Sequence, residues 1–96
     1  MKKKFEFRDK AIAAEFERLT EQDVKDLSQK FLEFFGTPVT RFAENVELSP
    51  VSVTLWLRGE RNLGVRSLAR IYNFLRGAKE YWNEKTNTLK NTSHEA

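Results

Sequence analysis

The two prolines of the chain constrain its fold most strongly, because each follows a hydroxyl residue, in Thr37-Pro38 and Ser49-Pro50. A hydroxyl side chain is a preferred helix N-cap, and proline suits the first helical position, where its missing N–H is not needed. The dipeptides therefore predict two short helices, over about 38–46 and 50–58. Gly59 is placed to end the second one.

Apolar residues at helical spacing predict three further helices, over 10–19, 21–35 and 65–76. Thr20 and Asp23 have the pattern of a capping box, which marks the start of the middle one, and Gly36 is placed to end it. Apolar side chains on one stripe of each helix are expected to face the core. They are Ile12, Phe16, Leu19, Val24, Leu27, Phe31, Phe34, Phe35, Leu68, Ile71, Tyr72 and Leu75.

These patterns predict an all-α fold, a compact bundle of about five helices with an additional N-terminal helix or arm. A chain of 96 residues that is 40% hydrophobic has material for one core. We expect a single helical domain over 1–85 and a flexible, disordered polar tail over 86–96. Residues 78–85 either extend the last helix or form a turn that folds Tyr81 and Trp82 back onto the core.

Charge is unevenly distributed along the chain. Residues 37–79 carry seven basic side chains, six of them arginine, against three acidic ones, whereas residues 5–36 are net acidic. Arginine binds phosphate and guanine well because its planar fork can make two parallel hydrogen bonds. A polyanionic partner is therefore one reading of the second half, and a solvated charged surface is the other.

The sequence lacks the residues that several kinds of catalytic, metal-binding and membrane-spanning structure require. The only histidine, His94, lies in the polar tail, so a catalytic triad, a histidine metal site and histidine acid–base catalysis are not expected. No cysteine is present for a thiolate zinc site, and no glycine-rich phosphate loop occurs. No stretch approaches the roughly 18 apolar residues of a membrane span. We therefore expect a non-enzymatic protein with no cofactor and no membrane segment.

The two short helices and their turn carry a set of residues that is specific in combination. The set comprises an aromatic–alanine pair, an apolar–hydroxyl turn, a branched residue followed by tryptophan, a closing glycine and a nearby base. These are Phe42-Ala43, Leu48-Ser49, Val53, Trp56, Gly59 and Arg61. The set resembles the helix-turn-helix of the lambda-repressor-like (Cro/XRE) DNA-binding family, from about residue 24 to 76. One departure is Glu47, which stands where the family usually has glycine in the turn.

The resemblance implies a sequence-specific, double-stranded DNA-binding transcriptional regulator of repressor type. In this family the second helix of the motif, here about 50–58, enters the major groove. It also implies a homodimer on a pseudo-palindromic site, and a phage or plasmid origin. The expected location is cytoplasmic, on the nucleoid of a bacterial or phage-infected cell.

Carried over position by position, the resemblance places base reading on Pro50, Val51 and Leu55. Apolar side chains can read only thymine methyl groups, while the flanking Ser52, Thr54 and Arg58 could supply hydrogen bonds. The opposite face of the helix, formed by Val53, Trp56 and Leu57, is expected in the core. The candidate phosphate-binding residues are Thr40, Arg41, Ser49, Arg61, Asn62 and Arg66.

The outward apolar residues allow two other interpretations. Scattered exposed hydrophobic residues are common on any protein surface. An apolar stripe rimmed by Arg58 and Arg61 is also typical of a surface that binds protein. The alternative function is therefore a protein-binding module on the same scaffold, such as a phage-encoded inhibitor of a host system or an antitoxin-like adaptor.

Overall fold

The structure, a computed structural model, describes residues 10–83, which are largely helical and contain no strand. A short helical stretch over 79–83 follows the last of the five main helices. The helices are α1 (Lys10–Glu17), α2 (Glu21–Phe35), α3 (Val39–Asn45), α4 (Pro50–Leu57) and α5 (Val65–Gly77). The predicted all-α fold is confirmed.

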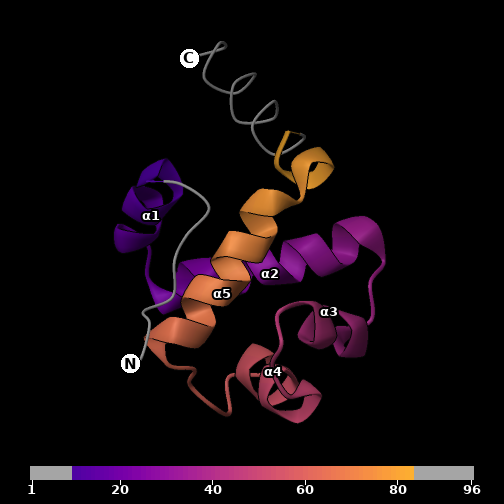
Figure 1. Ribbon diagram of the computed structural model, residues 1–96. Coiled ribbons are helices and arrows are strands. Elements are labelled where there is room, and N and C mark those ends of the chain that lie inside the picture. Colours follow the sequence, from indigo (N-terminus) through magenta and orange to yellow (C-terminus); the bar gives the residue numbers. More distant parts are fainter. Residues whose placement is uncertain (1–9, 84–96) are drawn as a thin grey trace, which may run out of the picture.

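The two longest helices, α2 and α5, pack against each other in the middle of the molecule (Figure 1). Helix α1 packs on α5 at one side, and the α3–α4 pair lies at the other end of the bundle. Helix α4 also contacts α2. The α3–α4 pair is thus attached to the rest of the bundle through the contact between α4 and α2.

The start of α2 follows the expected capping box. The Asp23 backbone N–H donates to Thr20 Oγ1 at 3.1 Å, and the Thr20 N–H donates to Asp23 Oδ2 at 2.9 Å. At the other end, Gly36 adopts a left-handed conformation with φ 63° that ends the helix. Local sequence therefore sets both ends of α2.

The two hydroxyl–proline pairs behave differently. Pro50 occupies the first turn of α4, and the Ser49 side chain accepts a hydrogen bond from the Ser52 N–H at 3.5 Å, as expected. The prediction for Thr37-Pro38 is wrong, because Pro38 is itself the N-cap of α3 and no side chain caps that helix. Proline has an extended ψ of 149° there, so the first helical residue is Val39.

The core contains most of the apolar residues expected in it. The fully buried side chains include Trp56, Phe42, Val53, Ile71 and Leu75. Residues from α2, α3, α4 and α5 form one hydrophobic cluster. The cluster consists of Val24, Phe31, Phe42, Ala43, Val46, Val53, Trp56, Leu68, Ile71, Leu75 and Tyr81. Ile12 is buried, and Phe16, Leu19 and Leu27 are partly buried against the core.

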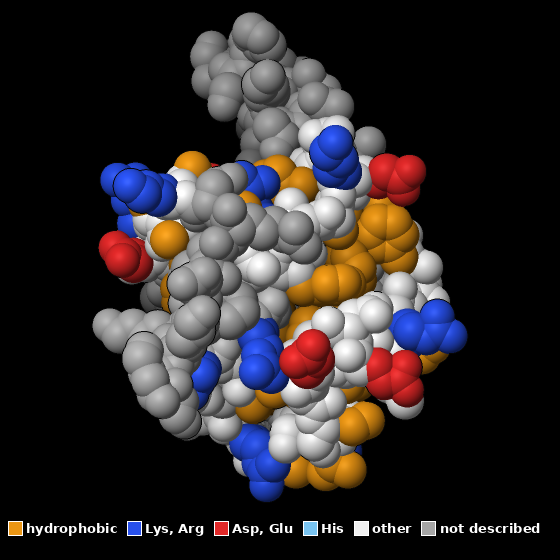
Figure 2. Space-filling view, in the orientation of Figure 1, with side chains coloured by type: hydrophobic (Ala, Val, Ile, Leu, Met, Phe, Trp, Pro, Cys, Tyr) orange, Lys and Arg blue, Asp and Glu red, His pale blue; other side chains and the backbone are white. Residues whose placement is uncertain are grey.

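Two residues predicted to face the core do not. Phe34 is 50% exposed and Phe35 is 40% exposed. Figure 2 shows hydrophobic side chains gathered at the surface over the C-terminal end of α2. Phe31 is buried, whereas Phe34 and Phe35 contact the Tyr81 and Phe31 rings and remain partly open to solvent at the end of α2.

The segment after α5 turns back onto the bundle, which decides between the two expectations for it. Ala78 interrupts the helix, and residues 79–83 form a new helical turn. Tyr81 is 1% exposed, and its hydroxyl donates to the Leu27 carbonyl of α2 at 3.0 Å. Trp82 is partly buried, with Arg76 stacked 4.4 Å from its ring centroid.

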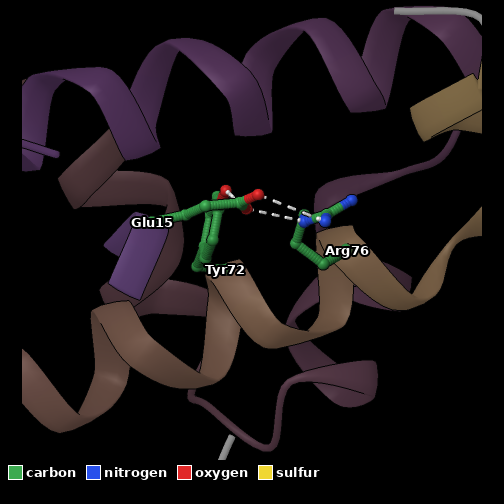
Figure 3. A network of polar contacts seen from close by, with 3 residues as sticks. All are labelled: Glu15, Tyr72 and Arg76. Atoms are coloured by element: carbon green, nitrogen blue, oxygen red, sulfur yellow. Dashed lines mark hydrogen bonds and ion pairs between the residues drawn. The ribbon is translucent and has the colours of Figure 1, made fainter. Parts of the chain in front are cut away.

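A polar network docks α1 onto α5 (Figure 3). The Glu15 carboxylate accepts a hydrogen bond from the Tyr72 hydroxyl at 2.7 Å and another from Arg76 Nε at 2.9 Å. Burial, and secondarily the hydrogen bond to Glu15, raises the pKa of Tyr72. Because Arg76 also stacks on Trp82, one arginine links α1, α5 and the 79–83 turn.

The tyrosines predict a loss of stability at alkaline pH. Burial raises the pKa of Tyr81 from 10.0 to about 12. The unfolded chain therefore releases the phenolic proton first, so the stabilisation is complete below pH 10.0 and is lost as the pH rises towards about 12. Each tyrosine lowers the free energy of unfolding by up to about 1.4 kcal/mol per pH unit across its window.

Urea unfolding at a series of pH values from neutral to alkaline measures this loss. The variant Tyr81→Phe has no proton to release at that position, so its alkaline slope should be shallower than that of the wild type. Equal slopes for the two proteins would contradict the assignment of the alkaline loss to Tyr81.

Some expectations fall on parts of the chain outside residues 10–83. These are the N-terminal arm and the polar tail over 86–96. Within residues 10–83, no helix is long and apolar enough to cross a membrane.

Candidate nucleic-acid interface

The turn between α3 and α4 is built on a left-handed residue. Glu47 has φ 60°, the only positive φ of a non-glycine residue within 10–83. The next residue, Leu48, donates its N–H to the Ala43 carbonyl at 2.9 Å, which closes the turn against the end of α3. The position where the resembling family has glycine therefore takes the conformation that glycine adopts most easily.

Arg70 of α5 supports this turn. Its Nη1 donates to the Glu47 carbonyl at 3.2 Å and lies 3.9 Å from the Glu47 carboxylate. For the basic residues of the second half, the sequence left open a polyanionic partner or a solvated surface; in the structure, one of them, Arg70, makes a bracing contact. The contact ties the turn before α4 to the central helix α5.

Replacing Glu47 with glycine is expected to stabilise the fold. A side chain in the left-handed region costs roughly 1–2 kcal/mol, which glycine avoids. Glycine also loses more backbone conformational entropy on folding, and this loss offsets part of the stabilisation. The Arg70 bond to the backbone carbonyl is retained, so we expect a net gain of about 0.5–1 kcal/mol in the free energy of unfolding. Chemical denaturation of Glu47→Gly measures it.

The matched control is Glu44→Gly, in the preceding helix, where glycine should instead be destabilising. A loss of stability in Glu47→Gly as large as that in the control would show that left-handed strain is not what limits this turn.

Helix α4 has two distinct faces. Val53 and Trp56 are fully buried in the core, while Val51 is 65% exposed on the opposite side. The outward face borders a shallow hollow of about 250 Å³. The residues that line it are Pro50, Val51, Thr54, Leu55 and Arg58. Five of the six predicted base-reading residues therefore share one continuous surface.

The sixth predicted base reader, Ser52, is held by an arginine. Arg61, in the loop after α4, donates from Nη1 to Ser52 Oγ at 2.7 Å. Arg58 lies at the end of α4, with its Nε 3.4 Å from the Glu60 carboxylate. Both side chains of this ion pair are more than half exposed, so water and salt screen it strongly. Exchanging the Glu60 carboxylate for a phosphate group would therefore cost Arg58 little free energy.

The predicted phosphate-binding residues are exposed and lie at helix starts or in the adjoining loop. Thr40 and Arg41 are in the first turn of α3, Ser49 caps α4, and Arg66 is in the first turn of α5. Arg61 and Asn62 lie between α4 and α5. Of these, Arg61 and Ser49 contact α4, while the others belong to neighbouring elements outside the lining of the hollow.

The orientation of α4 depends on Glu21, which sequence reasoning missed. Its Oε2 accepts a hydrogen bond from the Trp56 indole Nε1 at 2.8 Å and another from the Leu63 N–H at 3.2 Å. Glu21 stands at the start of α2, so one carboxylate joins α2 to α4 and to the loop before α5. A buried indole N–H usually requires an acceptor, but nothing local in the sequence identifies Glu21 as that acceptor.

A second contact holds the end of α4. The Gln29 side-chain amide of α2 donates to the Leu57 carbonyl at 3.2 Å. It satisfies a terminal carbonyl that has no partner within the helix. Helix α4 is thus bound to α2 at its inward face and at its C-terminal end.

The chain matches no model of a known protein family, no functionally characterised protein and no solved structure. Within residues 10–83, no three acidic, histidine or cysteine side chains gather in a way that could hold a metal ion. The resemblance described above therefore depends on residues in α3, in the turn, in α4 and in the loop that follows α4.

Proposed function

We propose that the chain is a sequence-specific regulator that binds double-stranded DNA as a homodimer, without catalysing a reaction. The α3–α4 pair acts as its helix-turn-helix, and the outward face of α4 enters the major groove. The expected setting is the bacterial or phage-infected cytoplasm, where such DNA is accessible.

One observation carries the proposal, namely the division of α4 between its faces. Val53 and Trp56 are completely buried, and Glu21 and Gln29 hold the helix by hydrogen bonds. An eight-residue helix is too short to be stable by itself. A helix held this firmly, with its other face exposed, is suited to present fixed contacts to a groove.

The chemistry of the exposed face indicates what it would read. Val51 and Leu55 offer only apolar contact, which in the major groove selects the thymine methyl group. Arg58 is the one lining residue able to bind guanine by two hydrogen bonds. Arginines at the surrounding helix starts would position the duplex through phosphate contacts.

Selection of bound duplexes from a random pool, repeated at two salt concentrations, tests the proposal. Enrichment of a thymine-rich pseudo-palindrome is the expected result, because a dimer presents two copies of the same face. If no preferred sequence were recovered at either salt concentration, the proposal of sequence-specific DNA binding would be contradicted.

Two arginine variants separate base reading from phosphate binding. We expect Arg58→Ala to weaken binding to the selected site by about 1–3 kcal/mol and to relax specificity at one position. Arg66→Ala should weaken binding to all sequences and reduce the salt slope by about one unit. Fluorescence anisotropy on cognate and random duplexes across a salt series measures both effects.

Arg18→Ala is the matched control, since this exposed arginine lies between α1 and α2 and does not line the hollow on α4. It should leave both affinities unchanged. An equal loss on cognate and random DNA in Arg58→Ala would remove its role in base reading.

The hollow on α4 supports a second candidate function, binding of a protein. Its lining is mainly apolar, and Val51 is among the most exposed large hydrophobic residues within 10–83. Recovery of one defined protein partner, lost in Val51→Ser, with no DNA shift at low salt, would favour this function over DNA binding.

A further inference from the structure

The C-terminal end of α2 carries an exposed aromatic patch, formed by Phe34 and Phe35. Half of Phe34 and two fifths of Phe35 are open to solvent. Adjacent exposed aromatic side chains are unusual on a monomeric surface and commonly mark an interface. This patch lies on α2, apart from the outward face of α4, and the proposed DNA contact does not use it.

The aromatic patch packs against buried rings on its inner side. The Phe35 ring lies 4.8 Å from the Phe31 ring, and the Phe34 ring lies 5.6 Å from that of Tyr81. Phe31 and Tyr81 are buried in the core. Because the exposed rings are already packed on one side, little side-chain entropy remains to be lost when their other side is covered.

Beside the patch lies an open hollow of about 380 Å³, lined by Lys30, Glu33, Phe34 and Tyr81. Lys30 and Glu33 are exposed and stand three residues apart, on one side of α2. The surface therefore combines a protruding aromatic pair, a recess and one charge of each sign.

We propose that a second copy of this chain covers the patch, with the two α2 helices antiparallel across a two-fold axis. A two-fold interface requires a surface that is complementary to itself. Antiparallel α2 helices satisfy this, because Lys30 faces the partner's Glu33 and Glu33 faces the partner's Lys30. An aromatic ring of each copy enters the recess of the other. The inference depends on the homodimer of the proposed function and names its surface.

Sedimentation of the 96-residue chain without DNA, over a range of protein concentrations, tests the interface. The wild type should be dimeric, and Phe34→Ser should raise the dimer dissociation constant by about 30-fold. Val65→Ser is the control, because Val65 is 71% exposed on α5 and lies outside the patch. The control should dimerise like the wild type.

Charge reversal tests the antiparallel arrangement. In a dimer of the Lys30→Glu variant, or of the Glu33→Lys variant, residues 30 and 33 of the two copies carry like charges at both places where they meet. Each variant should therefore weaken the dimer by about tenfold. An equimolar mixture of the two variants restores both attractive pairs and should form a heterodimer. Pairing of the two residues within one helix cannot produce that recovery, because each variant chain keeps its own like charges.

A wild type that stays monomeric up to its solubility limit would overturn the inference. A dimer that survives Phe34→Ser, or a mixture no more associated than its separate components, would do the same. These measurements contain no DNA, so their failure leaves the duplex selection as an independent test of the proposed function.

Discussion

Replacing Trp56 with alanine is expected to lower the free energy of unfolding by about 3–5 kcal/mol. Trp56 is the largest fully buried side chain within residues 10–83 and joins α4 to the core. Its removal leaves a cavity and deprives Glu21 of a hydrogen-bond donor. Small domains have only about 5–15 kcal/mol of stability, so the variant loses a large share of it and should unfold at a clearly lower urea concentration than the wild type. Circular dichroism and urea denaturation measure the loss.

Trp82→Ala is the matched control, because the chain has only these two tryptophans and Trp82 is partly exposed. Its loss should be clearly smaller, since it removes the stacking on Arg76 without opening a closed cavity. If the two variants were equally stable, Trp56 would not be the anchor that holds α4 in place.

Glu21→Ala is expected to lower the free energy of unfolding by about 2–4 kcal/mol, because two buried or partly buried donors lose a charged acceptor. The donors are the Trp56 indole and the Leu63 N–H. Glu21→Gln keeps one side-chain oxygen, so its loss should fall between those of the wild type and the alanine variant. DNA affinity should fall along with stability if α4 loses its orientation.

A double-mutant cycle with Trp56→Phe isolates the hydrogen bond, since phenylalanine has no N–H to donate. We expect a coupling energy of about 1–2 kcal/mol between the two positions. Glu44→Ala, an exposed acid on α3, serves as the control and should change stability little. A coupling energy near zero would mean that the carboxylate does not position α4.

Much of the helical framework could be predicted from local patterns. The capping box at Thr20, the stop at Gly36 and the start at Pro50 depend on residues within one turn of each helix end, and all three are confirmed. Thr37-Pro38 has the same pattern of a hydroxyl residue before proline, but α3 begins at Val39, one residue later than predicted. A local signal fixes a helix start only to within a residue or so when no side chain caps it.

The candidate site was only partly predictable. The angular spacing of α4 correctly assigned Val53 and Trp56 to the core and Val51 to the surface, because one helix determines all three directions. Contacts between distant segments left no such signal. Neither the bond from Glu21 to Trp56 nor the one from Arg61 to Ser52 could be derived from spacing. The role of this face in reading DNA stays a prediction.

By itself, the sequence determined where most helices begin and end and which stripe of each is apolar, since caps and periodicity act within a few residues. Only the tertiary structure decided that Glu21 orients α4, that Arg70 braces the left-handed Glu47, and that Phe34 and Phe35 remain exposed. These outcomes depend on which helices lie beside each other and where each neighbour ends. An apolar stripe shows that a side chain can be buried, but packing decides whether anything covers it.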